Sequence, residues 1–269
     1  MAESVYITGI AGFIGSTLAK YLYDDGYKVT GCDNLSYSDG SNLEGVSFPW
    51  ELADCAKVEG IKADTIVHLA ASTNATNTDR DEMMKENFDA TMKLVNRYPD
   101  KRFIFASTCL VELPTQNLYA TSKHLAETYI KAFDGDYVIL RFGNVYGPNQ
   151  RDWGPEPNVL AAWKKAVADG ETLKITGDGK QSRDFIHVDD ICEGIRATIA
   201  HPFVSKETIP LCTGVQHTIN SLAELVYPQR TLEFVPRSPL DYDHIDQSPN
   251  EASRLVGFTA KRSVVDYKP

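Results

Sequence analysis

The sequence has few of the residues that mark a disulfide-stapled or metal-binding protein. Its five cysteines are an odd number and include no Cys-x-x-Cys pair (Cys32, Cys55, Cys109, Cys192 and Cys212). The six histidines do not recur at metal-ligand spacing. This usage argues against both a disulfide framework and a zinc site. It predicts reduced thiols, a cytosol-like compartment and no metal.

The sequence also lacks a membrane span, a leader and an excess of positive charge. No apolar run approaches the roughly 18 residues that suggest a membrane-spanning helix. The first predicted strand begins at residue 4, which leaves no room for a signal peptide. The net charge of −10 argues against nucleic acid and anionic membranes as partners. We therefore expect a cytoplasmic protein.

Three glycines stand between the first apolar strand, residues 4–8, and an amphipathic helix. They are Gly9, Gly12 and Gly15. The helix that follows places Phe13, Ile14, Leu18 and Leu22 on one face. The first-turn amides of such a helix have no intrahelical partner, and the helix dipole adds positive charge there, so a pyrophosphate fits the junction. The pattern predicts a dinucleotide-binding turn.

An acidic residue ends the second predicted strand, residues 27–32. Asp33 follows Gly15 by eighteen residues. A carboxylate at this spacing can accept both ribose hydroxyls of the adenosine half, and it would repel a 2′-phosphate. The combination favours NAD over NADP.

The first half of the chain alternates strand and helix patterns. Further strands are predicted at 65–69, 102–106 and 137–141, and helices at about 80–97, 117–133 and 158–169. Such alternation predicts right-handed crossovers and a parallel sheet covered on both faces. Prolines and glycines become frequent past residue 147. We expect an α/β fold: a Rossmann-type doubly wound parallel sheet in residues 1–147, to which later segments return, and a smaller α/β substrate-binding lobe in residues 148–269.

Tyr119 and Lys123 lie one turn apart on the predicted helix 117–133. An ammonium group beside a phenol favours the phenolate, which can take a proton from a substrate hydroxyl while a hydride leaves the same carbon. Thr108 follows a central strand and could hydrogen-bond the same substrate oxygen. Taken alone, the pair could be a tyrosine and a solvated lysine on a helix. Downstream of a dinucleotide turn, the pattern favours catalysis.

In this order the motifs make the chain similar to the extended short-chain dehydrogenase/reductases of the nucleotide-sugar epimerase/dehydratase family, of the UDP-glucose 4-epimerase type. The resemblance covers nearly the whole chain. It is carried by residues 8–15, 33–35, 68–71, Asn87, Ser107-Thr108, Tyr119-x-x-x-Lys123, 141–148, 177–179, 183–190 and 252–258.

The resemblance implies a role for individual residues. The catalytic set would be Thr108, Tyr119 and Lys123, with Lys123 also holding the nicotinamide ribose. The cofactor-binding set would be Gly9, Gly12, Phe13, Ile14, Gly15, Asp33, Asn34, Glu51, Leu52, Leu69, Ala70, Ala71, Asn87, Tyr119 and Lys123. The substrate would be bound by Thr108, Asn144, Arg183 and Arg237.

Some of these assignments have alternatives. Arg183 would bond a diphosphate with its planar fork, or else pair with its neighbour Asp184. In the segment 187–190 we expect an aspartate to cap the next helix. Arg237 and Asp241 resemble a second diphosphate arginine and a ribose-binding aspartate, although their spacing does not align cleanly.

The chain departs from the family pattern between Thr108 and Tyr119. The loop is shorter than the one that usually helps to cover the sugar, which predicts a more open site. Cys109 and Leu110 stand where dehydratases carry an Asp-Glu pair, so water elimination is disfavoured. A GDP-fucose-type 3,5-epimerase would use Cys109 with a histidine, and residues 155–158 offer none. We expect Cys109 to be a buried small residue. Glu51 replaces the usual aspartate facing the adenine.

The reaction that remains is NAD-dependent 4-epimerisation of a nucleotide sugar, a UDP-hexose, through a transient 4-keto intermediate with Tyr119 as base. The alternatives are a 3,5-epimerase/reductase, a 4,6-dehydratase, and a non-catalytic NAD-binding protein on the same fold. The helices at 80–97 and 117–133 form a four-helix bundle in dimeric relatives. The resemblance therefore implies a homodimer.

Overall fold

The computed structural model describes residues 3–151 and 158–268, and its centre is a seven-stranded sheet in the order β10-β6-β5-β4-β1-β2-β3. Every neighbouring pair in it is parallel. The strands are β1 (Ser4–Thr8), β2 (Lys28–Asp33), β3 (Glu51–Leu52), β4 (Thr65–His68), β5 (Arg102–Thr108), β6 (Tyr137–Phe142) and β10 (Glu207–Leu211). The Rossmann-type doubly wound sheet expected from the sequence is confirmed.

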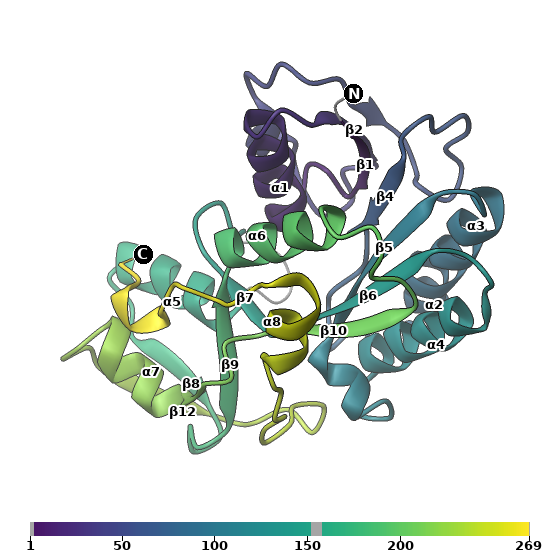
Figure 1. Cartoon of the computed structure of the whole chain (residues 1–269). Helices are drawn as coiled ribbons and strands as arrows, with labels where there is room; N and C mark the ends of the chain where they lie inside the picture. Colours follow the sequence, from purple (N-terminus) through teal and green to yellow (C-terminus); the bar gives the residue numbers. More distant parts are fainter. Residues whose placement is uncertain (1–2, 152–157, 269) are drawn as a thin grey trace.

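The sheet is buried on both faces because successive side chains of each strand point to opposite sides. Val5 and Ile7 of β1 belong to one apolar core, whereas Tyr6 between them belongs to another. Helices α1 (Phe13–Asp24) and α6 (Val188–Ile199) cover the first face, and α4 (Leu118–Ala132) covers the second with the helical run before it (Figure 1).

That helical run is predicted as one helix over 80–97, and it contains a π-helical turn. It consists of α2 (Arg80–Met84), the π segment Lys85–Asp89 and α3 (Ala90–Arg97). The Asp79 side chain caps its start by accepting a hydrogen bond from the amide of Glu82. The π turn holds Asn87, whose side chain is completely buried. π turns of this kind occur frequently at functional sites.

A smaller lobe follows β6. Its three-stranded sheet has the order β11-β9-β7, and β12 pairs with β8 beside it. The bounds are β7 (Asn144–Tyr146), β8 (Leu173–Thr176), β9 (Ser182–His187), β11 (Gln216–Thr218), β12 (Leu232–Val235), α5 (Val159–Ala168) and α7 (Ile219–Val226). A third apolar core lies here around Tyr146, Trp163 and Phe185. Between β9 and β11 the chain returns to the large sheet through α6 and β10.

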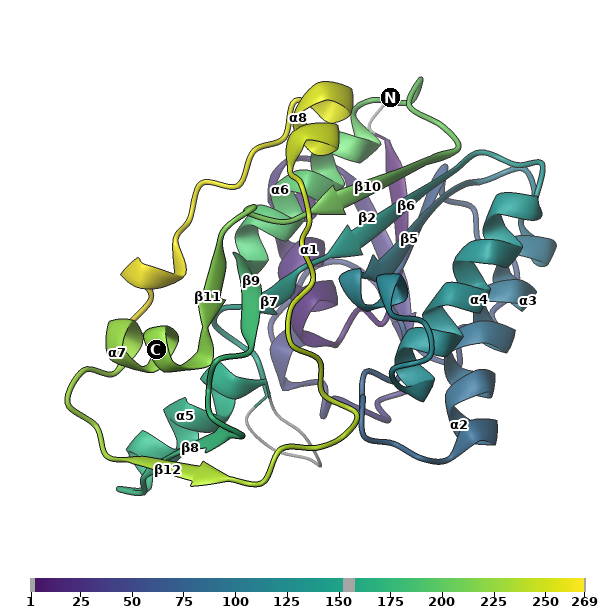
Figure 2. The same ribbon diagram turned by 90° about the horizontal axis from the view of Figure 1, so that it is seen from below.

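Residues 236–249, which we call the crossing coil, connect β12 to α8 (Asn250–Val256). Figure 2 shows this stretch running from the smaller lobe across to the large sheet. The coil has no regular secondary structure. Three short 3-10 helices complete the described chain: Ser41–Leu43, Cys109–Glu112 and Val264–Asp266. Within the described residues, no helix combines the length and apolar character needed to cross a membrane.

Candidate functional site

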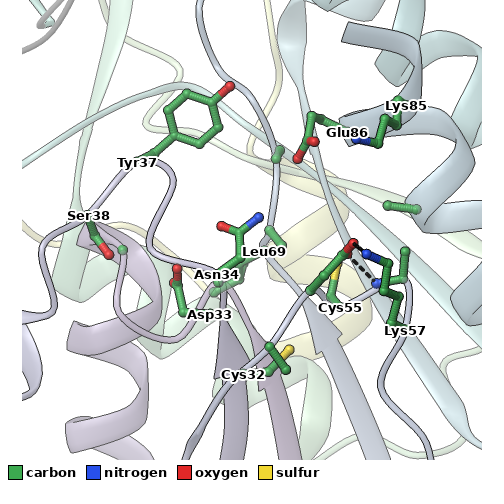
Figure 3. A pocket seen from close by; sticks show the side chains of 18 of the residues that line it. Cys32, Asp33, Asn34, Tyr37, Ser38, Cys55, Lys57, Leu69, Lys85 and Glu86 are labelled. Atoms are coloured by element: carbon green, nitrogen blue, oxygen red, sulfur yellow. Dashed lines mark hydrogen bonds and ion pairs between the residues drawn. The ribbon is translucent and has the colours of Figure 1, made fainter. Parts of the chain in front are cut away.

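A pocket lies at the carboxyl ends of β1, β2 and β4, where open parallel sheets bind ligands (Figure 3). Seven residues of the predicted cofactor set line it: Gly9, Gly12, Asp33, Asn34, Leu69, Ala70 and Ala71. The glycines are needed for steric reasons. Gly9 has φ +71°, and a Cβ on Gly15 would lie 2.0 Å from the carbonyl oxygen of Gly9. Side chains there would push the helix away from the strand.

Asp33 is held at the end of β2 by two backbone amides. Its Oδ2 accepts from the amide of Ala11 at 3.0 Å, and its Oδ1 accepts from the amide of Leu35 at 2.8 Å. The first bond ties the carboxylate to the glycine turn. The second holds it at the start of the loop, and Leu35 adopts a positive φ of 57°. This geometry fits a dinucleotide whose pyrophosphate lies on the turn and whose ribose lies on Asp33.

The opposite wall of the pocket differs from the prediction. Glu51 and Leu52 are outside the set of described residues that line it. The Glu51 carboxylate accepts from the Tyr6 hydroxyl at 2.8 Å, and Leu52 is 68 % exposed. Strand β3 pairs with β2 over two residues. The chain that follows β3 forms this wall of the pocket. Residues 53–57 line the pocket there, with Tyr37, Ser38, Lys85, Glu86, Ala90 and Lys93 elsewhere around it.

Six further residues of the predicted cofactor set are outside the described lining: Phe13, Ile14, Gly15, Asn87, Tyr119 and Lys123. Phe13 and Ile14 pack against the apolar core of the first sheet face. The Asn87 side chain is used inside the protein: Oδ1 accepts from the amide of Ser72, and Nδ2 donates to the Ser72 carbonyl and the Ser122 hydroxyl. Asn87 therefore joins the loop after β4 to helix α4.

Thr108 and Tyr119 meet beside the end of β5. Thr108 is the last residue of this strand, and Tyr119 lies in the first turn of α4, whose start is capped by Asn117. The hydroxyl of Thr108 accepts from the amide of Leu110 at 3.3 Å, and the Thr108 side chain is near enough to the Tyr119 phenol to lower the phenol pKa. The strand end and the helix start thus bring together two hydroxyls that are eleven positions apart in the sequence.

Lys123 differs from its prediction in what it contacts. Its ammonium donates to the carbonyl of Ala106 at 2.9 Å and lies 4.6 Å from the centre of the Phe105 ring. Burial lowers the pKa of Lys123 to about 7, against a smaller opposing effect of Glu127. Burial also raises the pKa of Tyr119, as does Cys109, whereas the hydrogen bond with Thr108 lowers it. Lys123 was expected to lower the pKa of the Tyr119 phenol. Among the described residues, Lys123 is not one of the groups that shift this pKa.

Sequence reasoning missed a buried carboxylate that joins β5, β6 and α4. Glu127 is 1 % exposed, and it accepts from the Ser107 hydroxyl at 2.6 Å and from Lys131 at 3.0 Å. Arg141 of β6 bonds both of its oxygens. The signal for it is the spacing: Glu127 follows Lys123 by four residues, on the same helix face. It fixes the helix that carries Tyr119 against the strand that carries Thr108.

The other three predicted substrate residues, Asn144 of β7, Arg183 of β9 and Arg237, lie where the smaller lobe meets the crossing coil. Arg183 pairs with Asp241 at 2.5 Å, and Arg237 bonds the same carboxylate at 3.2 Å. The amide of Asn144 is 3.5 Å from the hydroxyl of Tyr242. The alternative partner of Arg183 is wrong, because the carboxylate of Asp184 is taken by Thr213 and Gly214.

The cap of α6 is also different from the prediction. His187, and not an aspartate, caps the helix by accepting from the amide of Asp189 at 3.1 Å. Asp190 is fully buried and accepts from the amides of Lys261 and Arg262. Asp190 therefore fastens the C-terminal segment to α6.

The short loop after Thr108 does not leave the site open. It forms a 3-10 turn, and Cys109 and Leu110 pack with Ile245 and Tyr242 of the crossing coil. Cys109 is 7 % exposed, and burial raises the pKa of its thiol to about 11. Cys109 is therefore buried in an apolar cluster, as expected for a small packing residue.

With this geometry in place, comparisons identify the family. Residues 5–211 match the model of the NAD dependent epimerase/dehydratase family, so the chain belongs to that family. Its members are NAD-dependent enzymes that modify nucleotide sugars, which makes NAD the cofactor. The glycine turn and Asp33 are suited to hold it.

Among similar proteins, a UDP-glucose 4-epimerase of Mycolicibacterium smegmatis is 31 % identical over 254 residues, covering 80 % of this chain and 79 % of the relative. A UDP-N-acetyl-α-D-glucosaminuronate decarboxylase of Bacillus cytotoxicus is 28 % identical, covering 100 % of this chain and 94 % of the relative. The solved structure of a UDP-glucose 4-epimerase from Thermotoga maritima with UDP-glucose superposes with a TM-score of 0.89 at 25 % identity, covering 98 % of this chain and 95 % of that one.

Proposed function

We propose that this protein catalyses NAD-dependent 4-epimerisation of a UDP-hexose. The observation that carries the proposal is the proximity of Thr108 and Tyr119 at the end of β5, in the same sheet whose strands β1, β2 and β4 end at a pocket suited to a dinucleotide. A nucleotide sugar that places its diphosphate on Arg183 and Arg237 would extend its hexose toward Tyr119. The 4-epimerase relative and the structure containing UDP-glucose support this substrate class.

Tyr119 acts as the base on the C4 hydroxyl. Its phenolate takes the hydroxyl proton, and the Thr108 hydroxyl donates a hydrogen bond to the same substrate oxygen as it becomes a ketone. Lys123 holds the nicotinamide ribose. NAD held by the glycine turn and Asp33 would supply the acceptor and donor for the C4 hydride, and its positive nicotinamide would favour the phenolate that burial of Tyr119 disfavours. After the 4-keto sugar turns over, Tyr119 returns the proton to the oxygen as the alcohol re-forms.

Elimination of water or carbon dioxide would need further chemistry at the sugar. A dehydratase needs an acid and a base beside the threonine, and here those positions are a thiol with a pKa raised to about 11 by burial and a leucine. The decarboxylase relative performs its reaction on a sugar acid. Epimerisation uses just Thr108, Tyr119 and Lys123, all of which this chain has.

The deciding experiment incubates the protein and NAD with UDP-, GDP- and dTDP-sugars and follows the products by proton NMR. We expect a C4 epimer without net NADH. A 4-keto-6-deoxy product would contradict the proposal in favour of a dehydratase. NAD binding without turnover across the panel would favour the non-catalytic alternative.

We also propose a homodimer through the helices on the second sheet face. In Figure 2, α2, α3 and α4 lie side by side at one edge of the molecule. Leu125 is 38 % exposed on this surface, and Tyr129 packs edge-on against Phe88 at 6.1 Å. Sedimentation equilibrium is expected to give twice the monomer mass. Leu125→Glu should shift the protein toward monomer, because it places a charge in an apolar contact.

A further inference from the structure

Four buried polar side chains lie in a row beside the dinucleotide pocket. Thr8, His68 and Asn87 are completely buried, and Thr91 is 1 % exposed. Thr8 ends β1 and His68 ends the neighbouring strand β4, whereas Asn87 and Thr91 belong to the helical run packed on the second sheet face. We call these four residues the buried polar row. Polar groups at this depth are costly unless each has a partner.

Hydrogen bonds join the row from end to end. Thr8 Oγ1 lies 2.7 Å from His68 Nδ1, and Thr91 Oγ1 lies 3.0 Å from His68 Nε2. At the strand end, the amide of Ala70 donates to Thr8 Oγ1 at 3.2 Å. At the helix end, the Thr91 hydroxyl donates to the Asn87 carbonyl at 2.6 Å. The imidazole of His68 is therefore the middle of a continuous connection from β1 to the π turn.

The two threonines fix the position of the imidazole proton. A threonine hydroxyl has one proton to donate. Thr91 gives its proton to the Asn87 carbonyl, so its oxygen accepts from His68 Nε2, which carries the ring proton. His68 Nδ1 then accepts from the Thr8 hydroxyl. Burial, with a smaller effect of Lys123, lowers the pKa of His68 to about 3, so the ring is neutral at pH 7.

The strand end of the row holds one wall of the pocket. Leu69, Ala70 and Ala71 line the pocket together with Gly9. A Cβ on Gly9 would lie 2.8 Å from the Ala70 nitrogen, so the backbone of Ala70 packs directly against the glycine turn. Thr8 bonds this wall twice, because its carbonyl also accepts from the amide of Leu69 at 3.2 Å. A shift of the Thr8 side chain would therefore move Ala70 relative to Gly9.

The helix end of the row is anchored in its turn. Asn87 Nδ2 donates to the Ser122 hydroxyl at 2.9 Å, and that hydroxyl donates to the Tyr119 carbonyl at 2.8 Å. Asn87 Oδ1 accepts from the amide of Ser72 at 2.8 Å. The row thus ends on helix α4 and on the loop after β4, which give it a fixed support.

We infer that His68 is a positioning residue for the cofactor, which in its Nε2–H form holds the Ala70 wall of the NAD pocket on the π turn. His68 is outside the described lining, so it acts through Thr8 and Ala70. A ring bonded to one threonine alone would leave a buried polar atom unpaired, and both partners are therefore needed. The inference concerns NAD, the cofactor of the family, and it does not depend on which sugar reaction the protein catalyses.

The first test compares NAD affinity, by titration calorimetry, in the wild type, Thr91→Val and Thr91→Ser. Valine lacks the hydroxyl that accepts from His68, whereas serine keeps it. We expect Thr91→Val to weaken NAD binding about threefold to tenfold, and Thr91→Ser to stay within about twofold of the wild type.

Thr198→Val is the matched control for the loss of a buried hydroxyl. Thr198 is completely buried, and its hydroxyl bonds the Gly194 carbonyl within helix α6. This variant should keep the NAD affinity within about twofold of the wild type. All three variants are compared at a temperature at which circular dichroism shows each of them folded.

A second measurement reads the imidazole in the unmodified protein, so it does not depend on a variant folding. Nitrogen-15 NMR of the histidine side chains distinguishes the two neutral tautomers, and contacts with the methyl groups of Thr8 and Thr91 assign the His68 signals. We expect the Nε2–H form in the NAD-free wild type and in Thr91→Ser. In Thr91→Val the Nε2 proton should shift upfield, because its hydrogen bond is lost.

An Nδ1–H form in the wild type would overturn the inference, because Thr91 could then not accept from the ring. Equal NAD affinities in the wild type and Thr91→Val would also overturn it, since the row would stabilise the fold without placing the cofactor. Equal weakening by Thr91→Ser or Thr198→Val would do the same, because lost packing or stability would explain the effect. A protein that binds NAD as expected here but converts no sugar nucleotide would contradict the proposed function alone.

Discussion

Arg141 bonds both oxygens of Glu127, with Nε to Oε1 at 2.9 Å and Nη2 to Oε2 at 2.7 Å. The pair connects β6, which lies next to the strand that carries Thr108, to α4, the helix that carries Tyr119. Burial would raise the pKa of Glu127, but hydrogen bonds from Arg141 and Ser107 lower it below its ordinary value. The carboxylate is therefore charged at neutral pH and stabilises the folded protein.

Glu127→Gln is expected to lower the free energy of unfolding by about 3 kcal/mol at pH 7, because it leaves Arg141 partly unpaired. A carboxyl with a depressed folded pKa stabilises above its unfolded pKa of about 4.3, and that contribution is lost as the pH falls through the folded pKa. Urea unfolding should therefore show the difference between wild type and variant shrinking in acid. Glu112→Gln is the control, since Glu112 meets the same arginine but is 53 % exposed, and it should cost at most about 1 kcal/mol. Equal losses for both variants would contradict the prediction.

Tyr119→Phe should reduce turnover by about 10²-fold to 10⁴-fold, since it removes the base and leaves the ring in place. NAD binding should change little, because the contacts of the glycine turn and Asp33 remain. Steady-state epimerisation and NAD titration measure the two effects separately. An active Tyr119→Phe enzyme would show that another group takes the C4 proton.

Lys123→Met should change how stability depends on pH in the NAD-free protein. Burial lowers the folded pKa of Lys123 to about 7, while the unfolded value is about 10.4. Between these values the unfolded chain binds more protons, so the wild type gains stability as the pH rises. The variant lacks this gain. The urea midpoint of the wild type should therefore rise more between pH 7 and pH 9.5 than the midpoint of Lys123→Met does. The same change in both proteins would contradict the lowered pKa of Lys123.

Asp33→Ala should weaken NAD binding by about tenfold to a hundredfold, because charge-assisted hydrogen bonds to the ribose hydroxyls are lost. Discrimination against NADP should also relax, since the repulsion of the 2′-phosphate disappears. Titration with both cofactors tests this. An unchanged preference would mean that Asp33 serves just to hold the amides of Ala11 and Leu35.

Cys109→Ala should keep epimerase activity within about threefold of the wild type, because a buried thiol with a pKa raised to about 11 supplies no acid or base at neutral pH. The loss of the sulfur should cost about 1 kcal/mol in stability. Product analysis by NMR and urea unfolding provide the two readouts. A loss of activity by orders of magnitude would favour the 3,5-epimerase alternative.

The parts of the site that could be predicted are those set by local spacing. Gly9, Gly12 and Asp33 follow from a strand, a tight turn and the next strand, and Tyr119 and Lys123 follow from the helical repeat. Each of these relationships spans a few residues or one crossover. The pocket residues Leu69, Ala70 and Ala71 were expected from the family resemblance, and they stand at the end of a neighbouring parallel strand.

The missed or wrong assignments involve contacts between segments distant in the sequence. Glu51 bonds Tyr6, and Arg183 bonds Asp241 fifty-eight residues away instead of its neighbour. No periodicity encodes such partners, since they depend on how the two lobes and the crossing coil pack.

By itself the sequence determined the α/β alternation, the dinucleotide turn and the Tyr119–Lys123 pair, because hydrophobic periodicity and glycine geometry act over short distances. Only the tertiary structure decided that the Lys123 ammonium contacts the Ala106 carbonyl, that Glu127 ties α4 to Arg141 of β6, and that Asp241 and Tyr242 lie on the substrate residues. These contacts form when burial forces charged and polar groups to find partners across the fold, and a buried charge pairs with whichever opposite group the packing brings near.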